Sequence, residues 1–282
     1  MATPLSADAF VRALRAEGVQ VVEHDNWRTH NRNHKGPWGP VGGVMLHHTA
    51  GTSSVDFCRA GYTELPGPLC IGVLTKHGRV HLIGYGRTNH AGNGSQAVYH
   101  AVLAESALPA SPGPDAIDGN ARFYGFEIEN TGDAGDPYPS AQLDAAERVS
   151  AAICRAHGWG SGSVIGHKEW TRRKPDPSFS MPGMRSRIAQ RLGTRPQPQP
   201  GYEPFPGAAF FAAGRRSGLV TAVGKRLAAE GCGRYTQGPG PVWTQADQTS
   251  YAAWQRKLGY RGDDADGIPG QASWDKLRVP RA

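Results

Sequence analysis

The stretch GGVMLHHTAG, residues 42–51, decides the fold of the larger part of the chain. Its first half is a short apolar run, which predicts a buried β-strand, and its second half is polar. We therefore expect His47 and His48 to lie where a strand of the core ends. Successive strand residues point to opposite faces, so His47 and His48 should face different sides of the sheet.

Strand and helix patterns alternate on both sides of this stretch. Strands are predicted in VQVVEH (19–24), LCIGVLTKHGRVHLIG (69–84), YGFEIENTG (124–132) and SVIGH (163–167). Apolar residues at helical spacing predict helices at 6–18 and 140–157. This order predicts an α/β fold, in which a central mixed β-sheet is flanked by helices and the polar strand ends gather at one edge.

A proline-rich segment divides the chain. Residues 195–206, RPQPQPGYEPFP, have no hydrophobic period and are typical of a stiff linker. We therefore expect a larger domain over residues 1–194 and a small helical domain over residues 207–282. The second domain has helix patterns near 218–230 and 246–258, followed by a turn-rich segment that leads into a short helix.

The charge balance of the chain is positive, because 31 Lys and Arg against 24 Asp and Glu give a formal net charge of +7. Such a surface attracts polyanions, of which nucleic acid and an anionic cell wall are two. The basic residues are scattered, and the dense groups at 28–35 and 170–174 form no long basic helix, so we expect no nucleic-acid binding. No apolar run approaches the roughly 20 residues of a membrane helix, so we expect no membrane span.

The start of the chain and its cysteines both indicate a cytoplasmic protein. The first 18 residues lack the basic start, apolar stretch and small-residue cleavage site of a secretory signal. Four cysteines are widely spaced without a C-x-x-C pair, which indicates neither a disulfide framework nor a zinc ribbon. A reduced compartment fits this pattern, and a bridge between Cys58 and Cys70 stays open.

Polar clusters follow three of the predicted strands, at residues 47–49, 127–129 and 167–176. Polar residues at strand ends that meet at one edge of a sheet can together form an active site. A catalytic zinc site needs three protein ligands and leaves a fourth position for water. The candidate ligands here are His47, His167 and Asp176. Lone histidines are more often surface or packing residues, so spacing alone leaves both interpretations open.

A zinc ion at such a site would lower the pKa of its bound water toward roughly 7, so that the water can attack an amide carbonyl. A carboxylate beside the water would act as general base, and a fixed cation could stabilise the oxyanion. We assign these roles to Glu127 and Lys174. Glu129 has the same strand parity as Glu127 and competes with it for the role of base.

Several motifs resemble the type 2 N-acetylmuramoyl-L-alanine amidase family, which includes peptidoglycan recognition proteins and many phage endolysins. They are LHHTAG at 46–51, GFEIEN at 125–130, GHKEW at 166–170 and RKPDPSF at 173–179. The resemblance spans about residues 40 to 190. It implies a zinc amidase whose metal ligands are His47, His167 and Asp176. In such an amidase, Lys174 would stabilise the transition state and Glu127 would lie near the water.

The same resemblance implies roles for further residues. Some family members place a tyrosine where this chain has Cys70, and this difference favours Glu127 as the base. His90, in RTNHAGNG, matches a His-Ala-Gly that often contacts substrate, with a solvated loop histidine as the alternative. Trp170 and Thr171 follow the ligand histidine and would line the substrate cleft, with a buried tryptophan as the alternative.

Residues 251–277, YAAWQRKLGYRGDDADGIPGQASWDKL, resemble a peptidoglycan-binding domain. The Asp266–Gly267 pair has a structural explanation, because both residue types tolerate a tight turn. Three tryptophans could stack on glycan, although in so small a domain at least one or two should belong to the core. They are Trp243, Trp254 and Trp274. The resemblance, rather than these tryptophans, therefore indicates wall binding.

The combined interpretation is a two-domain endolysin. Its first domain would hydrolyse the amide between N-acetylmuramic acid and L-alanine in peptidoglycan, and its second domain would hold it on the wall. We expect a monomer that waits in the host cytoplasm until it is released to the wall. Two rivals stay open: a host autolysin or wall-recycling amidase, and a peptidoglycan recognition protein that binds without cutting.

Overall fold

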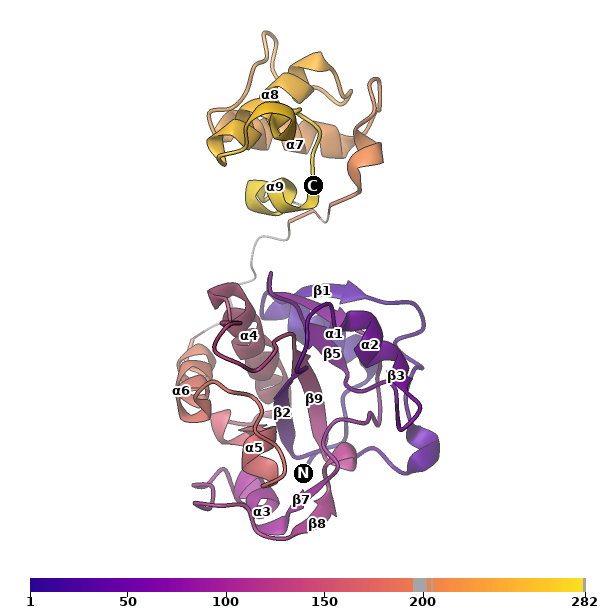
Figure 1. Ribbon diagram of the computed structural model, residues 1–282, viewed down its shortest axis with the longest axis vertical. Helices are drawn as coiled ribbons and strands as arrows, with labels where there is room; N and C mark the ends of the chain where they lie inside the picture. Colours follow the sequence, from indigo (N-terminus) through magenta and orange to yellow (C-terminus); the bar gives the residue numbers. More distant parts are fainter. Residues whose placement is uncertain (195–201, 204, 281–282) are drawn as a thin grey trace. The chain divides into compact units, whose positions relative to one another are not determined.

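The computed structural model describes residues 1–194, 202–203 and 205–280. The chain divides into two compact units, Met1–Gln199 and Pro200–Ala282 (Figure 1). The linker expected at 195–206 lies for the most part outside the described residues, so its stiffness stays a prediction.

The first unit is built on a six-stranded sheet with the strand order β1-β6-β5-β9-β2-β10. These strands are β1 (Gln20–Glu23), β2 (Gly43–His48), β5 (Gly72–Leu74), β6 (Arg79–Leu82), β9 (Phe123–Ile128) and β10 (Val164–Gly166). Neighbouring strands run parallel except β5 and β6, which pair antiparallel around the predicted turn. Two small sheets pair β3 (Gly61–Tyr62) with β4 (Leu65–Pro66) and β7 (Asn93–Ser95) with β8 (Asp115–Asp118).

Helices cover this sheet, which confirms the predicted α/β fold with a central mixed sheet. The α-helices are α1 (Ala7–Ala16), α2 (Val55–Ala60), α3 (Gln96–Ala104), α4 (Ser140–His157), α5 (His167–Trp170) and α6 (Met181–Leu192). Short 3-10 helices are η1 (Asn33–Lys35), η2 (Gly119–Ala121) and η3 (Ser161–Ser163). The hydroxyl of Ser6 accepts the Ala9 N–H at 3.2 Å and so caps α1 as predicted.

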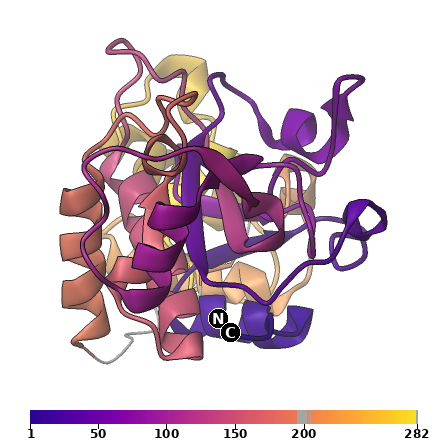
Figure 2. The same cartoon turned by 90° about the horizontal axis from the view of Figure 1, so that it is seen from below.

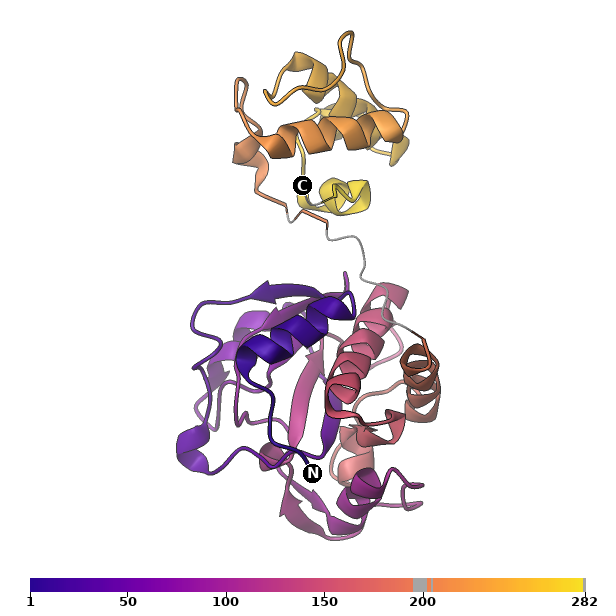
Figure 3. The ribbon, with the colours of Figure 1, turned by 180° about the vertical axis from the view of Figure 1, so that it is seen from behind.

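The two faces of the sheet pack against different helices. On β2, Val44 and Leu46 belong to the apolar core shared with α1, α4 and α6. Figure 3 shows α1 and α4 side by side over this face. Met45 points the other way, into a second core that is shared with α3 and α5. His47 has the parity of Met45, so it lies on the face that α3 and α5 partly cover.

A smaller cluster completes the second face of the sheet. Cys58 of α2 packs there with Cys70, Leu69, Val73 and Ile83. In Figure 2, α2 and the β3–β4 pair stand out from one margin of the unit. Cys58 and Cys70 are both buried and free, so the structure has no bridge between them.

The second unit is helical around its own apolar core. Its elements are η4 (Ala208–Phe211), α7 (Gly218–Ala229), α8 (Gln245–Lys257), η5 (Gly262–Ala265) and α9 (Gln271–Leu277). Trp243, Trp254 and Trp274 all lie in this core and are 3%, 5% and 1% exposed. None of the three therefore offers a ring face to a glycan.

The Asp266–Gly267 turn has the structural role expected for it. Gly267 has a φ of +81°, which a residue with a side chain rarely adopts. Gln255 Oε1 accepts the Gly267 N–H at 2.7 Å, and Gln255 Nε2 donates to the Ile268 carbonyl at 3.0 Å. The turn is thus bonded to α8.

In both units, none of the described helices is both long enough and apolar enough to cross a membrane.

Candidate active site

The carboxyl ends of β10, β2 and β9 meet at one edge of the sheet. His47, near the end of β2, pairs in register with Glu127 of β9. Paired residues on neighbouring parallel strands point to the same face, so both side chains lie on the side of α3 and α5. His167 directly follows β10 and begins α5. The structure thus brings these polar strand ends together, as the sequence predicted.

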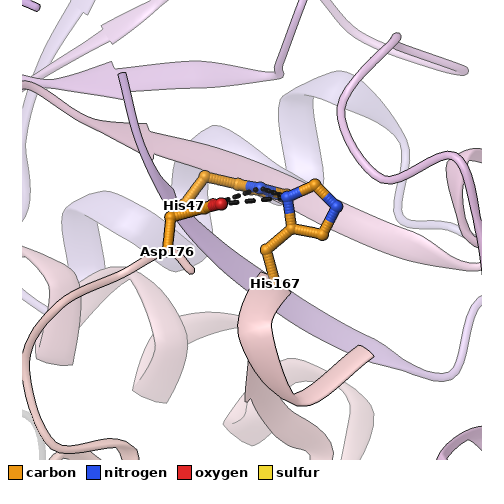
Figure 4. A group of neighbouring side chains, drawn as sticks. All are labelled: His47, His167 and Asp176. Atoms are coloured by element: carbon orange, nitrogen blue, oxygen red, sulfur yellow. Dashed lines mark hydrogen bonds and ion pairs between the residues drawn. The ribbon is translucent and has the colours of Figure 1, made fainter. Parts of the chain in front are cut away.

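His47, His167 and Asp176 converge on one point (Figure 4). The Nδ1 atoms of the two histidines are 2.9 Å apart, and each lies 3.3 Å from Oδ2 of Asp176. All three residues are buried, and one ligand atom from each lies within 4.8 Å of the others. This cluster has the donor set and the spacing of a three-residue metal site.

Hydrogen bonds on the far side of each ring indicate which nitrogen of each histidine carries a proton. Nε2 of His167 lies 3.2 Å from the carbonyl oxygen of Ala91, and a carbonyl can only accept, so Nε2 carries the proton. In the neutral ring, Nδ1 of His167 then carries the lone pair that can bind a metal ion. Nε2 of His47 lies 2.9 Å from Nδ1 of His90, and the tautomer of His47 that donates this bond carries its lone pair on Nδ1 as well.

The charges of the three clustered residues suit a bound cation. Burial lowers the pKa of His47 to about 4, with further lowering from His167, so His47 is neutral at pH 7. Burial alone would raise the pKa of Asp176, but its bonds with His167 and His47 outweigh burial and lower it, so the carboxylate is ionised. The two Nδ1 atoms and the carboxylate oxygen thus lie within 4.8 Å of one another. A divalent metal ion satisfies all three, so the residues fit a metal site.

His90 supports His47 from a tightly packed position. It is 7% exposed, and burial lowers its pKa well below the usual value, so it is not a solvated loop histidine. Its ring lies against Gly125 of β9, where an added Cβ would be 2.4 Å from His90 Cγ. Gly125 therefore leaves the space in which the His90 ring reaches His47.

Substituting Gly125 by alanine should force the His90 ring off the sheet. We expect the free energy of unfolding to fall by about 1–3 kcal/mol, as overpacking of a core usually does. Urea denaturation measures this loss. Gly193→Ala is the matched control, because its added Cβ would meet only ordinary contacts at 3.5 Å and 3.7 Å. A Gly125→Ala protein as stable as the Gly193→Ala protein would contradict the packing argument.

Glu127 has the environment of a group that exchanges protons. Its Oε2 is buried and has no hydrogen-bond partner among the described residues. Burial raises its pKa well above the usual value, and Cys58 and Asp176 add to the rise. Glu129, by contrast, lies just beyond the end of β9, and its Oε2 accepts the Ser54 N–H at 3.4 Å. Of the two glutamates, Glu127 is therefore the one with an unpartnered oxygen, and it lies at the register position of His47.

The loop between α5 and α6 carries both Asp176 and Lys174. Lys174 is exposed, and its positive charge is close enough to the site to oppose the rise in the pKa of Glu127 that burial causes. The Asp176 carbonyl accepts the Lys168 N–H at 2.6 Å, and Lys168 Nζ donates to the Phe179 carbonyl at 2.7 Å. These bonds hold a segment without regular secondary structure against α5.

The same loop is also bonded to β2 from the face opposite the site. His48 points away from His47, as strand parity predicts, and its Nδ1 lies 3.0 Å from the hydroxyl of Tyr138. That hydroxyl lies 3.1 Å from Ser178 Oγ and accepts the Ser178 N–H at 3.4 Å. A phenol donates one hydrogen bond and accepts two, so Tyr138 can satisfy all three contacts.

Trp170 and Thr171 lie in the interior of the protein, at the end of the short helix that begins with His167. Trp170 is fully buried and packs edge-on against Tyr99 and Phe123, which fits the alternative of a buried tryptophan. Thr171 is 1% exposed, and its hydroxyl donates to Asp115 at 3.2 Å. Neither side chain is accessible to a substrate in this structure. Both are part of the packed interior next to His167.

The sequence of the first unit matches a known protein family. Residues 37–179, about half of the chain, match the family described as N-acetylmuramoyl-L-alanine amidase. The chain belongs to this amidase family. The match includes His47, Glu127, His167, Lys174 and Asp176. Membership in the amidase family supports peptidoglycan amidase activity for this chain.

Solved structures that are similar to this amidase family member include other amidases. The N-acetylmuramyl-L-alanine amidase AmiD from E. coli, in complex with the substrate anhydro-N-acetylmuramic acid-L-Ala-D-γ-Glu-L-Lys, has 17% identity and a TM-score of 0.39, over 86% of this chain and 89% of that chain. The endolysin amidase LysCS from Clostridium intestinale URNW has 14% identity and a TM-score of 0.39, over 60% and 94%. AmpDh3 from Pseudomonas aeruginosa has 15% identity and a TM-score of 0.40, over 92% and 96%.

Structural similarity at these TM-scores does not identify a function. No curated protein sequence matches this chain. The family assignment therefore depends on the sequence match over residues 37–179.

Three residues of the amidase site were not predicted from the sequence. They are Ala91, Asn120 and Tyr138. The Ala91 carbonyl accepts from the candidate ligand His167, Asn120 accepts from the backbone of His90 and Ala91, and Tyr138 joins His48 to Ser178 of the loop that carries Asp176. The motif His90-Ala91-Gly92 gave a signal for the first, although its expected role was contact with substrate. Tyr138 and Asn120 lie in loop or 3-10 segments, and no periodicity marked them.

Proposed function

We propose that this member of the amidase family is a zinc-dependent N-acetylmuramoyl-L-alanine amidase that acts as an endolysin. The observation that carries the proposal is the buried cluster of His47, His167 and Asp176, in which one possible ligand atom from each residue converges. The orphaned Oε2 of Glu127 lies on the same face of the sheet, at the register position of His47. A metal position and a proton acceptor are thus built side by side.

Each residue has a separate task in this proposal. His47, His167 and Asp176 would hold zinc, which supplies the polarisation that makes water a nucleophile at neutral pH. Glu127 would take the proton from the attacking water and pass it to the leaving nitrogen of the amide. The Lys174 ammonium would stabilise the negative charge that develops on the carbonyl oxygen.

The assignment to an endolysin extends the proposal to the second unit. Residues 251–277 resemble a peptidoglycan-binding domain, and the net charge of the whole chain, +7, suits an anionic wall. Holding the enzyme on an insoluble polymer raises the local concentration of its substrate. The buried tryptophans mean that such binding would use other surface groups of this unit. The protein would act as a monomer on peptidoglycan, after release from the host cytoplasm.

The proposal is tested by digesting purified sacculi with the full chain, with and without a chelator. We expect new L-alanine amino termini, loss of this release with chelator, and recovery on adding zinc. New reducing sugar ends instead would identify a glycosidase. Binding to sacculi without release of amino termini by the zinc-loaded protein would identify a recognition protein. Cleavage of small soluble muropeptides without binding to intact sacculi would identify a recycling amidase.

A further inference from the structure

One short segment contacts both candidate histidine ligands from behind. Nδ1 of His90 meets Nε2 of His47 at 2.9 Å, and the carbonyl oxygen of the next residue, Ala91, accepts from Nε2 of His167 at 3.2 Å. The rings of His47 and His167 lie at 75° to each other with their centroids 4.5 Å apart. The orientation of both rings therefore depends on where the His90–Ala91 segment lies.

One side-chain oxygen accepts two backbone hydrogen bonds from this segment. Oδ1 of Asn120 accepts the N–H of His90 at 2.9 Å and the N–H of Ala91 at 2.8 Å. Asn120 is 8% exposed, so water cannot readily replace it as the acceptor. Two consecutive backbone donors on one oxygen fix the direction of the peptide between them, and with it the Ala91 carbonyl and the His90 ring.

The position of Asn120 is itself fixed. It lies in η2, and its N–H donates to Oδ1 of Asp118 at 3.1 Å. The neighbouring Gly119 donates to the Gly92 carbonyl at 2.8 Å, and an added Cβ on Gly119 would be 2.7 Å from the Ala91 Cβ. This close approach leaves η2 little room to shift relative to the His90–Ala91 segment.

We propose that Asn120 is a positioning residue for the metal, which acts through His90 and Ala91 to turn Nδ1 of both histidine ligands toward the ion. The inference rests on the proposed zinc function. It assigns to one buried amide the orientation of two ligands that it does not touch. Partners that orient metal ligands in this way typically change metal affinity by about 10–100-fold when they are removed.

The test compares Asn120→Ala with the wild-type chain in zinc affinity, measured by competition with a chromophoric chelator. We expect a dissociation constant that is about 10–100-fold larger. The d–d absorption bands of the cobalt-substituted protein should shift as well, because these bands report ligand geometry. Asn120→Asp retains the accepting oxygen and should restore zinc affinity to within about threefold of wild type, on the same principle.

Ser95→Ala is the matched control. Ser95 is fully buried, and its hydroxyl oxygen accepts two backbone N–H groups, those of Val98 at 3.3 Å and Gly113 at 3.0 Å, without touching a ligand. This variant should lower stability and leave zinc affinity unchanged. If Asn120→Ala does not fold, Asn120→Gln replaces it, because the longer side chain displaces the accepting oxygen.

The possible outcomes separate the inference from the function. Zinc affinity in Asn120→Ala, or in its replacement, within twofold of wild type would overturn the positioning role. An equal loss in Asn120→Asp would overturn it too, because the accepting oxygen would then not be the cause. A wild-type chain that binds no zinc would instead overturn the proposed function.

Discussion

Replacing Asp176 by alanine should abolish stoichiometric zinc binding and lower amide hydrolysis of sacculi at least about a thousandfold. Asp176 supplies the only ionised oxygen of the three-residue cluster, and its Oδ2 lies 3.3 Å from Nδ1 of both histidines. Without it, two neutral imidazoles would have to hold a divalent ion alone. Zinc content after dialysis and the rate of release of amino termini measure the two effects.

A surface carboxylate on the same unit provides the control for this substitution. Asp144 of α4 forms ion pairs with Arg148 and Arg191, away from the candidate ligands. Asp144→Ala should keep one zinc per chain and near wild-type activity. Full zinc content in Asp176→Ala would remove Asp176 from the metal site. Full activity with zinc lost would show that hydrolysis does not need the ion.

Glu127→Gln should lower kcat by about 10²–10⁴-fold, the usual contribution of a positioned general base. The amide has nearly the shape of the carboxylate but cannot take a proton from water. Glu127 offers no atom to the cluster of candidate ligands, so zinc content should stay at the wild-type level. Steady-state kinetics on a soluble muramoyl peptide, together with metal analysis, separates the loss of a base from the loss of the ion.

Glu129→Gln is the control that the strand itself provides. Glu129 has the parity of Glu127, but its carboxylate already accepts the Ser54 N–H beyond the strand end. We expect its kcat to stay within about threefold of wild type, a change of less than 1 kcal/mol in the barrier. The reverse result, a large loss in Glu129→Gln and a small one in Glu127→Gln, would transfer the role of base to Glu129.

The part of the site on regular structure could be predicted from the sequence. An apolar run that ends in His47 and His48 places one side chain on each face of a strand, and the structure has this arrangement. The helix predicted at 140–157 has these bounds in the structure, since its apolar residues recur at helical spacing. In the second unit, the helices α7 and α8 begin and end within one residue of their expected bounds.

Long-range contacts could not be predicted in the same way. The loop that carries Asp176 has no period. The polar cluster after a strand made this residue a candidate ligand, and the family resemblance then favoured that role over a solvated surface group. The bond between His47 and His90 joins residues 43 positions apart, and nothing in either segment specifies the other. Trp170 next to a ligand suggested a cleft wall, but glycines at positions 94 and 119 leave room for its ring in the interior. A side chain can fill such a space only after the fold has brought the two segments together.

The hydrogen bonds behind the Asp176 loop have a consequence for how the protein acquires its ion. Tyr138 joins Ser178 to His48, and Lys168 holds the Asp176 carbonyl, so the loop is held by hydrogen bonds that do not involve the side chains of the candidate ligands. In many small zinc domains, by contrast, folding and metal binding are a single event. Here the apoprotein would stay folded but inert, and the supply of the ion alone would switch it on.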